Sequence, residues 1–221
     1  LPTEIQERLA QRVCLPLDGL KVACYYGCAL LRPAEICGFD DDEQPHTMED
    51  LVALSGATPI EWNFKNECCG ASHQISVPKT GRTMIRRILE NAAANGADAI
   101  ACACPLCMLN LDMREAEINA ARAKEDLPPL DMPIYYFTEL LAASMGAPAS
   151  KSGINRHFHP AGNLHERALA AWNKQRAAKK EAEEAERSAK EAQRKARAAT
   201  RAAKAKSESK PETNATKEVI A

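Results

Sequence analysis

The chain has 221 residues, a formal net charge of −1 and nine cysteines. The near-neutral total hides an acidic body and a basic tail, because residues 1–172 contain 15 Lys and Arg against 22 Asp and Glu, whereas residues 173–221 contain 14 against 8. An acidic body argues against a nucleic-acid-binding domain, for which a basic folded surface is expected. No apolar run reaches the roughly 18 residues of a membrane span, and no charged leader precedes an apolar segment. We therefore expect a cytoplasmic protein without a membrane span.

The first half of the chain predicts two strand–helix pairs. Residues 3–13 form a predicted lead-in helix, because apolar residues recur there every four positions. Residues 21–26 are a nearly continuous apolar run that ends at Gly27, which is typical of a strand buried on both faces. A loop is predicted over 29–46, and Thr47 is expected to cap a helix that ends near Gly56.

The same alternation continues along the second half of the chain. Further strands are predicted at 58–62, 97–104 and 133–137. Further helices are predicted at 83–95, 105–124 and 138–146. Alternating strands and helices imply an α/β fold with a small, mostly parallel sheet flanked by helices.

The C-terminal region differs from the rest in composition. Residues 163–206 are dominated by Ala, Lys, Arg and Glu, so helix propensity is high but little apolar area is available for packing. We expect a long, charged, solvated helix with a disordered tip over 207–221. The predicted organisation is a lead-in helix and linker at 1–20, a cysteine-rich domain at 21–162 and a tail at 163–221.

Five cysteines follow three of the predicted strands. Cys28 comes directly after the first strand, Cys68 and Cys69 follow the second, and Cys104 and Cys107 follow the third. Gly70 permits the turn that two adjacent cysteines need to reach one object, because glycine tolerates positive φ. Parallel sheets place ligands beyond the carboxyl ends of their strands. We therefore predict that the five thiols meet at one metal or redox centre.

Three kinds of centre are compatible with these residues. An iron–sulfur cluster has several irons and accommodates five sulfur ligands, which makes it the preferred interpretation. A tetrahedral zinc ion would use four thiolates and leave the fifth without a place. A redox dithiol at Cys104 and Cys107, with Cys104 near a helix N-terminus, would leave the other three without a role.

Other residues are weaker candidates. Cys14, Cys24, Cys37 and Cys102 are expected to be buried small hydrophobes. His73 follows the cysteine pair and is interpreted chiefly as a polar surface residue. Four cations fall in or beside the helix predicted at 83–95, where an exposed helix face is the expected reading and attraction of an anion is the alternative: Lys79, Arg82, Arg86 and Arg87.

Several motifs together resemble a known family. Tyr25-Tyr26-Gly27-Cys28, Cys68-Cys69-Gly70-Ala71 and Cys104-Pro105-Leu106-Cys107 resemble the cysteine-rich CCG domain found in the B subunit of heterodisulfide reductase. The spacing is specific, with 39 residues between Cys28 and Cys68 and 34 between Cys69 and Cys104. The resemblance covers roughly residues 15–160 and is strongest to bacterial-type relatives.

The resemblance implies an oxidoreductase subunit with a particular cofactor. In that family each CCG domain binds a non-cubane four-iron four-sulfur cluster through five cysteines, which here would be Cys28, Cys68, Cys69, Cys104 and Cys107. A disulfide is reduced between two such clusters, and electrons arrive from a flavin-containing subunit through a small ferredoxin-like one. This chain has one Cys-Cys-Gly unit, which resembles the second of the family's two, so the facing half is expected in a preceding segment or a separate chain.

Overall fold

The computed structural model describes residues 2–159 and 163–208. The chain divides into two compact units, Leu1–Asn173 and Lys174–Ala221. The first unit contains a four-stranded sheet in the order β2-β1-β3-β4. Its strands are β1 (Lys21–Tyr25), β2 (Thr58–Ile60), β3 (Ala99–Cys102) and β4 (Ile134–Tyr136). All three pairings between these strands are parallel, which confirms the predicted fold class.

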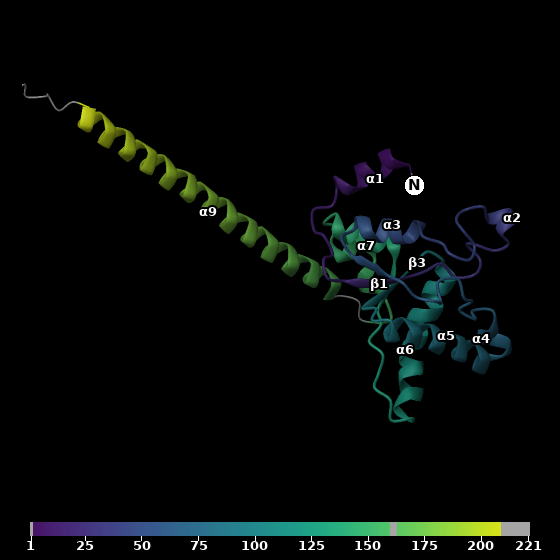
Figure 1. Ribbon diagram of the computed structural model, residues 1–221. Coiled ribbons are helices and arrows are strands. Elements are labelled where there is room, and N and C mark those ends of the chain that lie inside the picture. The colour runs from purple at the N-terminus through teal and green to yellow at the C-terminus, as the bar shows by residue number, and fades with distance from the viewer. Residues whose placement is uncertain (1, 160–162, 209–221) are drawn as a thin grey trace, which may run out of the picture. The chain divides into compact units, whose positions relative to one another are not determined.

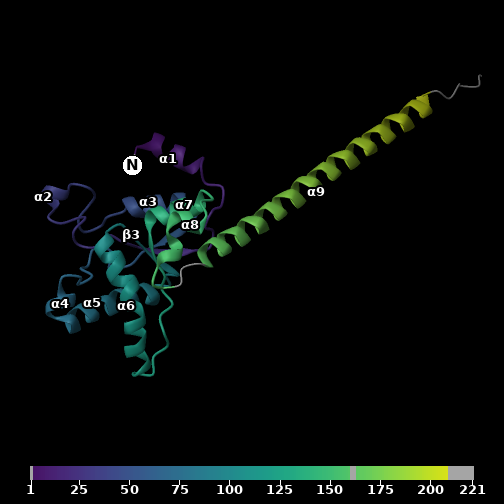
Figure 2. The same ribbon diagram turned by 180° about the vertical axis from the view of Figure 1, so that it is seen from behind.

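Helices cover both faces of the sheet (Figures 1 and 2). Helices α3 (Thr47–Leu54) and α7 (Phe137–Ser144) pack together on one face. Helices α5 (Pro78–Ala94) and α6 (Pro105–Ala123) pack together on the other. Helix α1 (Thr3–Ala10) contacts α3. The sheet is thus buried between two helical layers, as the apolar strands require.

Strand alternation divides the core into two clusters. On β1, Val22 and Cys24 pack with the α3 and α7 side chains, whereas Ala23 and Tyr25 pack with those of α5 and α6. Successive side chains of a strand point to opposite faces, so a wholly apolar strand serves both clusters. The cluster beneath α5 and α6 also contains Cys69 and Cys107, so this face leads directly to the predicted centre.

Short helices occupy segments for which the sequence predicts no regular element. They are α2 (Ala34–Cys37), α4 (His73–Ser76), α8 (Ala149–Ser152) and the 3-10 helix η1 (Ile154–Arg156). Helix α5 begins at Pro78, five residues before the predicted start. Its first turn is stabilised by packing that apolar periodicity does not reveal, because Gly81 lies against the Gly70 carbonyl and the Gln74 side chain.

The N-terminus of α3 is capped differently from the prediction. Thr47 lies inside the helix, and its backbone N–H donates to the Asp40 carboxylate at 2.7 Å. The His46 N–H donates to the same oxygen at 3.0 Å. The capping group therefore comes from the loop before the helix rather than from Thr47, which corrects the prediction. A residue six or seven positions away is outside the sequence pattern of a local cap.

Replacing the cap should lower stability in a pH-dependent way. Asp40→Ala should cost about 1 kcal/mol of unfolding free energy at neutral pH, as is usual for loss of a helix cap. Burial raises the pKa of Asp40, but backbone donors at Thr47, Asp41 and His46 lower it more, so its folded pKa lies below the ordinary value. The stabilisation is present above the ordinary pKa and is lost as pH falls through the folded one. Urea unfolding of both proteins at neutral pH and below the folded pKa should show the difference shrinking.

The C-terminal region is helical over most of its length. Helix α9 (Asn163–Glu208) matches the helix predicted at 163–206, and its described side chains are exposed. Its described side chains form three ion pairs at i, i+4 spacing: Lys180–Glu184, Lys190–Glu186 and Lys195–Glu191. The predicted tip at 207–221 begins inside this helix, and residues 209–221 lie outside the described residues. Across the described helices, none combines the length and the apolar character that crossing a membrane requires.

Candidate metal centre

The carboxyl ends of the parallel strands carry the five cysteines. Cys28 lies three residues beyond β1, and Cys104 is the N-cap residue of α6, two residues beyond β3. Cys68 and Cys69 lie in the long connection between β2 and α4. Since all strands run the same way, these segments gather at one edge of the sheet.

Hydrogen bonds hold the connection after β2 against the end of β1. The N–H groups of Tyr26 and Gly27 both donate to the Lys65 carbonyl, at 2.7 and 3.1 Å. The Tyr25 hydroxyl donates to the Glu67 carbonyl at 2.6 Å. These three bonds bring the residues just before Cys68 to the residues just before Cys28. A strand and a loop some 40 positions apart thereby present their cysteines together.

The five thiols are neighbours. The Cys28 thiol is hydrogen-bonded with the Cys68 thiol and also interacts with that of Cys69. The Cys107 thiol is hydrogen-bonded with the thiols of Cys69 and Cys104. Cys69 thus connects the thiol after β1 with those at the start of α6. Burial raises the pKa of the nearby Tyr25 hydroxyl, and four thiols raise it further: those of Cys107, Cys69, Cys68 and Cys28.

Two glycines permit this close approach. Gly27 has φ +68°, and a Cβ at that position would lie 2.8 Å from Cys107 Sγ. Gly70 has φ +73°, which confirms the turn predicted after the cysteine pair, and its N–H donates to Cys68 Sγ at 3.3 Å. A Cβ at Gly70 would meet Met84 Sδ at 2.9 Å. A side chain at Gly27 would therefore crowd Cys107, and one at Gly70 would push the segment after the cysteine pair away from α5.

Protonation differs among the thiols. The hydrogen bond from Cys107, together with the Ala71 N–H and the Asn110 side chain, lowers the pKa of Cys69 despite its burial. The hydrogen bond to Cys69 and burial raise the pKa of Cys107. Burial and the hydrogen bond with Cys68 raise the pKa of Cys28. Metal ligation uses the thiolate, a form that the surroundings of Cys69 favour.

Supporting residues were not anticipated from the sequence. Asn110 Nδ2 donates to the Cys69 carbonyl at 2.8 Å, and Asn110 is itself buried. It lies three positions after Cys107, so it faces the same side of α6. The three-residue spacing from Cys107 was the sequence feature that could have identified Asn110 as part of the site.

His73, which follows the cysteine pair, contributes its backbone N–H to the Gly70 carbonyl at 2.9 Å, and its side chain is half-buried.

The remaining cysteines follow the prediction only in part. Cys24 and Cys102 are fully buried within β1 and β3, and burial raises the pKa of both thiols. They are small hydrophobic residues of the core, as expected. Cys14 is exposed and Cys37 is half-buried, so the prediction of burial is wrong for these two. Neither belongs to a strand of the sheet, and cysteine content alone does not indicate burial in such segments.

The donor set fits a metal centre with several sulfur ligands. All nine cysteines are free thiols, and Gly27, which has no Cβ, leaves room beside Cys107 Sγ that a side chain would fill. Within residues 2–159 and 163–208, no three or more His, Cys, Asp or Glu side chains are arranged to hold a single metal ion. The five thiols as a ligand set remain a prediction.

Two histidines directly after η1 are engaged by carboxylates. His157 lies between Glu139, at 3.1 Å, and Asp112, at 3.6 Å. His159 lies between Glu115, at 2.9 Å, and Asp131, at 3.0 Å. The Asp112 carboxylate also accepts the N–H groups of residues 158 and 159, at 2.9 and 2.8 Å. These contacts attach the segment after η1 to α6.

Comparison with known proteins agrees with the position of the thiols. Residues 22–112 match the model of the CCG cysteine-rich domain. The membrane anchor subunit of 8-methylmenaquinol:fumarate reductase from Wolinella succinogenes is 31% identical over 159 residues, covering 72% of this chain and 54% of that protein. The B subunit of ferredoxin:CoB-CoM heterodisulfide reductase from Methanosarcina mazei is 29% identical over 153 residues, covering 68% and 49%.

A further heterodisulfide reductase B subunit, from the ferredoxin- and F420H2-dependent enzyme of Methanosarcina acetivorans, is 28% identical over 155 residues. The chain spans about half the length of these curated relatives. Each of the three belongs to an oxidoreductase, which supports a redox role for the matched region. Over residues 22–112 the chain thus matches the cysteine-rich CCG domain, and over most of its length it is similar in sequence to the B subunits of heterodisulfide reductases.

Proposed function

We propose that this chain is an iron–sulfur subunit of a heterodisulfide-reductase-like complex. Cys28, Cys68, Cys69, Cys104 and Cys107 would hold a non-cubane four-iron four-sulfur cluster. The observation that carries the proposal is the gathering of thiols from three strand ends at one edge of the sheet, within a CCG domain. A cytoplasmic location belongs to the proposal, because free thiols in this number suit a reducing compartment.

The arrangement of the thiols supports a centre with more than one metal atom. Sulfur ligands of a single zinc ion surround one point at about 2.3 Å from it. Here five thiols are neighbours, since Cys28 interacts with Cys68 and Cys69, and Cys107 interacts with Cys69 and Cys104. Five sulfur ligands exceed the four that one tetrahedral zinc ion takes, whereas a cluster offers several irons.

The chemistry proposed is the reduction of a disulfide. The sulfur–sulfur bond accepts two electrons and two protons and yields two thiols. The electrons would come from a ferredoxin-like partner, which a flavin-containing partner supplies in turn. When bound, the cluster would pass these electrons singly and engage a substrate sulfur.

The chain's own residues would shape that site. Asn110 fixes the Cys69 carbonyl at 2.8 Å, which orients the buried cysteine of the pair. Gly27 lets the backbone after β1 reach Cys107 Sγ. Leu106, between Cys104 and Cys107, is 66% exposed, so an apolar side chain beside these two thiols is available to a partner or substrate. We expect a facing half, from a further segment or a separate chain, to complete the site.

A dithiol at Cys104 and Cys107 is the second candidate, because their thiols are hydrogen-bonded neighbours at the start of α6. A dithiol would use only these two thiols and would leave Cys28, Cys68 and Cys69, which lie at the same edge of the sheet, without a role. The cluster therefore explains more of the site.

Metal analysis of anaerobically purified protein tests the proposal. We expect iron and acid-labile sulfide in a ratio near one, with little zinc, and an electron paramagnetic resonance signal after oxidation in the presence of a thiol. Zinc-loaded, iron-free protein would point instead to a zinc-stabilised interaction module. Metal-free protein with a titratable Cys104–Cys107 disulfide would favour the dithiol.

A further inference from the structure

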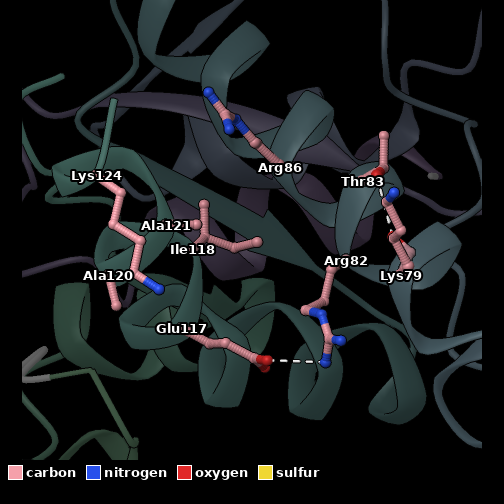
Figure 3. Close-up of a pocket in the computed structure, with 9 residues that line it drawn as sticks. All are labelled: Lys79, Arg82, Thr83, Arg86, Glu117, Ile118, Ala120, Ala121 and Lys124. Atoms are coloured by element: carbon pink, nitrogen blue, oxygen red, sulfur yellow. Dashed lines mark hydrogen bonds and ion pairs between the residues drawn. The ribbon is translucent and has the colours of Figure 1, made fainter. Parts of the chain in front are cut away.

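A groove between α5 and α6 lies apart from the cysteines. Its cavity volume is about 360 Å³. Figure 3 shows Lys79 and Lys124 on opposite sides of the groove, with Ile118 and Ala121 between them and the Arg82–Glu117 ion pair along one margin. The floor is thus apolar and the rim is charged, a combination that suits a small organic ligand with polar ends.

Positive charge exceeds negative charge around this groove. Glu117 pairs with both Arg82, at 2.8 Å, and Arg114, at 3.2 Å. A second set joins Arg86 and Arg122 to two carboxylates, those of Glu90 and Glu125. Four arginines therefore share three carboxylates, which leaves one positive charge uncompensated in these ion pairs.

Two lysines add to that excess. Lys79 and Lys124 are exposed, and no ion pair joins either of them to a carboxylate in the part of the chain that the structure describes. With the arginine excess, the groove carries about three surplus positive charges. The rest of this part of the chain has the opposite sign, because residues 1–172 contain more acidic than basic side chains. This local reversal of sign distinguishes the groove from an ordinary solvated helix face.

The sequence indicates a related but different set of cations. It groups Arg87 with Lys79, Arg82 and Arg86, yet the Arg87 guanidinium lies 5.4 Å from the centroid of the Phe64 ring, at a separate small pocket. The groove is lined by Lys124 instead of Arg87, and Lys124 lies 42 positions after Arg82 in the sequence. The packing of α5 against α6 creates the site, so neither helix predicts it alone.

We propose that this groove binds a small organic dianion whose oxyanions are phosphate or carboxylate groups. Its charged ends would contact Lys79 and Lys124, and its carbon skeleton would lie over Ile118 and Ala121. The Thr83 hydroxyl donates to the Lys79 carbonyl at 3.0 Å, and the hydroxyl oxygen remains free to accept at the same margin. Size favours a small ligand over a polypeptide, because the two lysines flank one short groove rather than an extended stripe.

Isothermal titration calorimetry of the full chain tests the proposal. The probes are inorganic pyrophosphate, glutarate and an oligoglutamate peptide, each at constant ionic strength. Lys79→Gln/Lys124→Gln removes the two unpaired cations, and both positions are exposed, so folding should be unaffected. Lys180→Gln/Lys190→Gln removes the same charge from α9 and is the matched control.

We expect saturable binding of pyrophosphate, glutarate or both, weakened about tenfold or more by the groove variant and unchanged by the tail variant. The probe that binds identifies the oxyanion. Equal weakening by both variants, or no saturable binding of either small probe, would overturn the proposal. Binding of oligoglutamate alone would also overturn it, in favour of an acidic polypeptide.

Discussion

Cys69→Ala should purify with little iron, whereas the wild-type chain retains a full complement under the same anaerobic conditions. Cys69 is buried, its pKa is lowered by donors from Cys107, Ala71 and Asn110, and its thiol joins the pair 68–69 to Cys107. Loss of a residue that merely supports a ligand typically costs roughly 10–100-fold in metal affinity, so removal of a direct ligand should cost at least as much. Iron and sulfide per chain are the quantities to measure.

The matched control for this variant is Cys24→Ala. Cys24 is also a fully buried thiol of the same unit, but it packs beneath α3 and α7. Its removal should leave the iron content unchanged and cost stability only through a small cavity. Similar iron loss in both variants would mean that any buried cysteine matters equally, and the ligand set would then be wrong.

Gly27→Ala should lose both stability and bound iron. The residue has φ +68°, a conformation that costs a residue with a Cβ about 1–2 kcal/mol. The added Cβ would lie 2.8 Å from Cys107 Sγ, so either the sulfur or the backbone after β1 must move. Chemical denaturation gives the first effect, and metal content after desalting gives the second.

Gly96→Ala separates these two effects. Gly96 has φ +78°, and a Cβ there would meet nothing within 4 Å. This variant should lose a similar amount of unfolding free energy, about 1–2 kcal/mol, while keeping its iron. If Gly27→Ala retained as much iron as Gly96→Ala, the contact between Gly27 and Cys107 would have no bearing on the centre.

The fold was predictable wherever apolar periodicity dominated. The strand at 21–26 and the helix from Pro105 were placed to within a residue or two, because their apolar residues are buried by neighbours on both sides. The start of α5 was missed because its first turn depends on Gly81 meeting Gly70, a contact between segments. The Asp40 cap was missed for the same reason, since its partner lies beyond the local pattern.

The sequence predicted which cysteines form the candidate site, but it did not predict the groups that surround and orient them. Strand-end positions and the Cys-Cys-Gly unit indicated which thiols would gather. Three hydrogen bonds of the site could not be predicted, because each joins segments that are distant in the sequence. They involve the Lys65 carbonyl, the Tyr25 hydroxyl and the Asn110 side-chain amide. Exposure of Cys14 was likewise invisible, because a cysteine's burial depends on what the fold places over it.

The position of Trp62 makes its fluorescence sensitive to the state of the candidate metal centre. Its indole is buried, donates to the Cys24 carbonyl at 2.9 Å, and lies 6.1 Å from the Tyr25 ring. Tyr25 in turn adjoins the thiols, so a chromophore there would accept excitation energy from the indole. In a Trp172→Phe background, the fluorescence of Trp62 should dim as the centre assembles and brighten as it is lost.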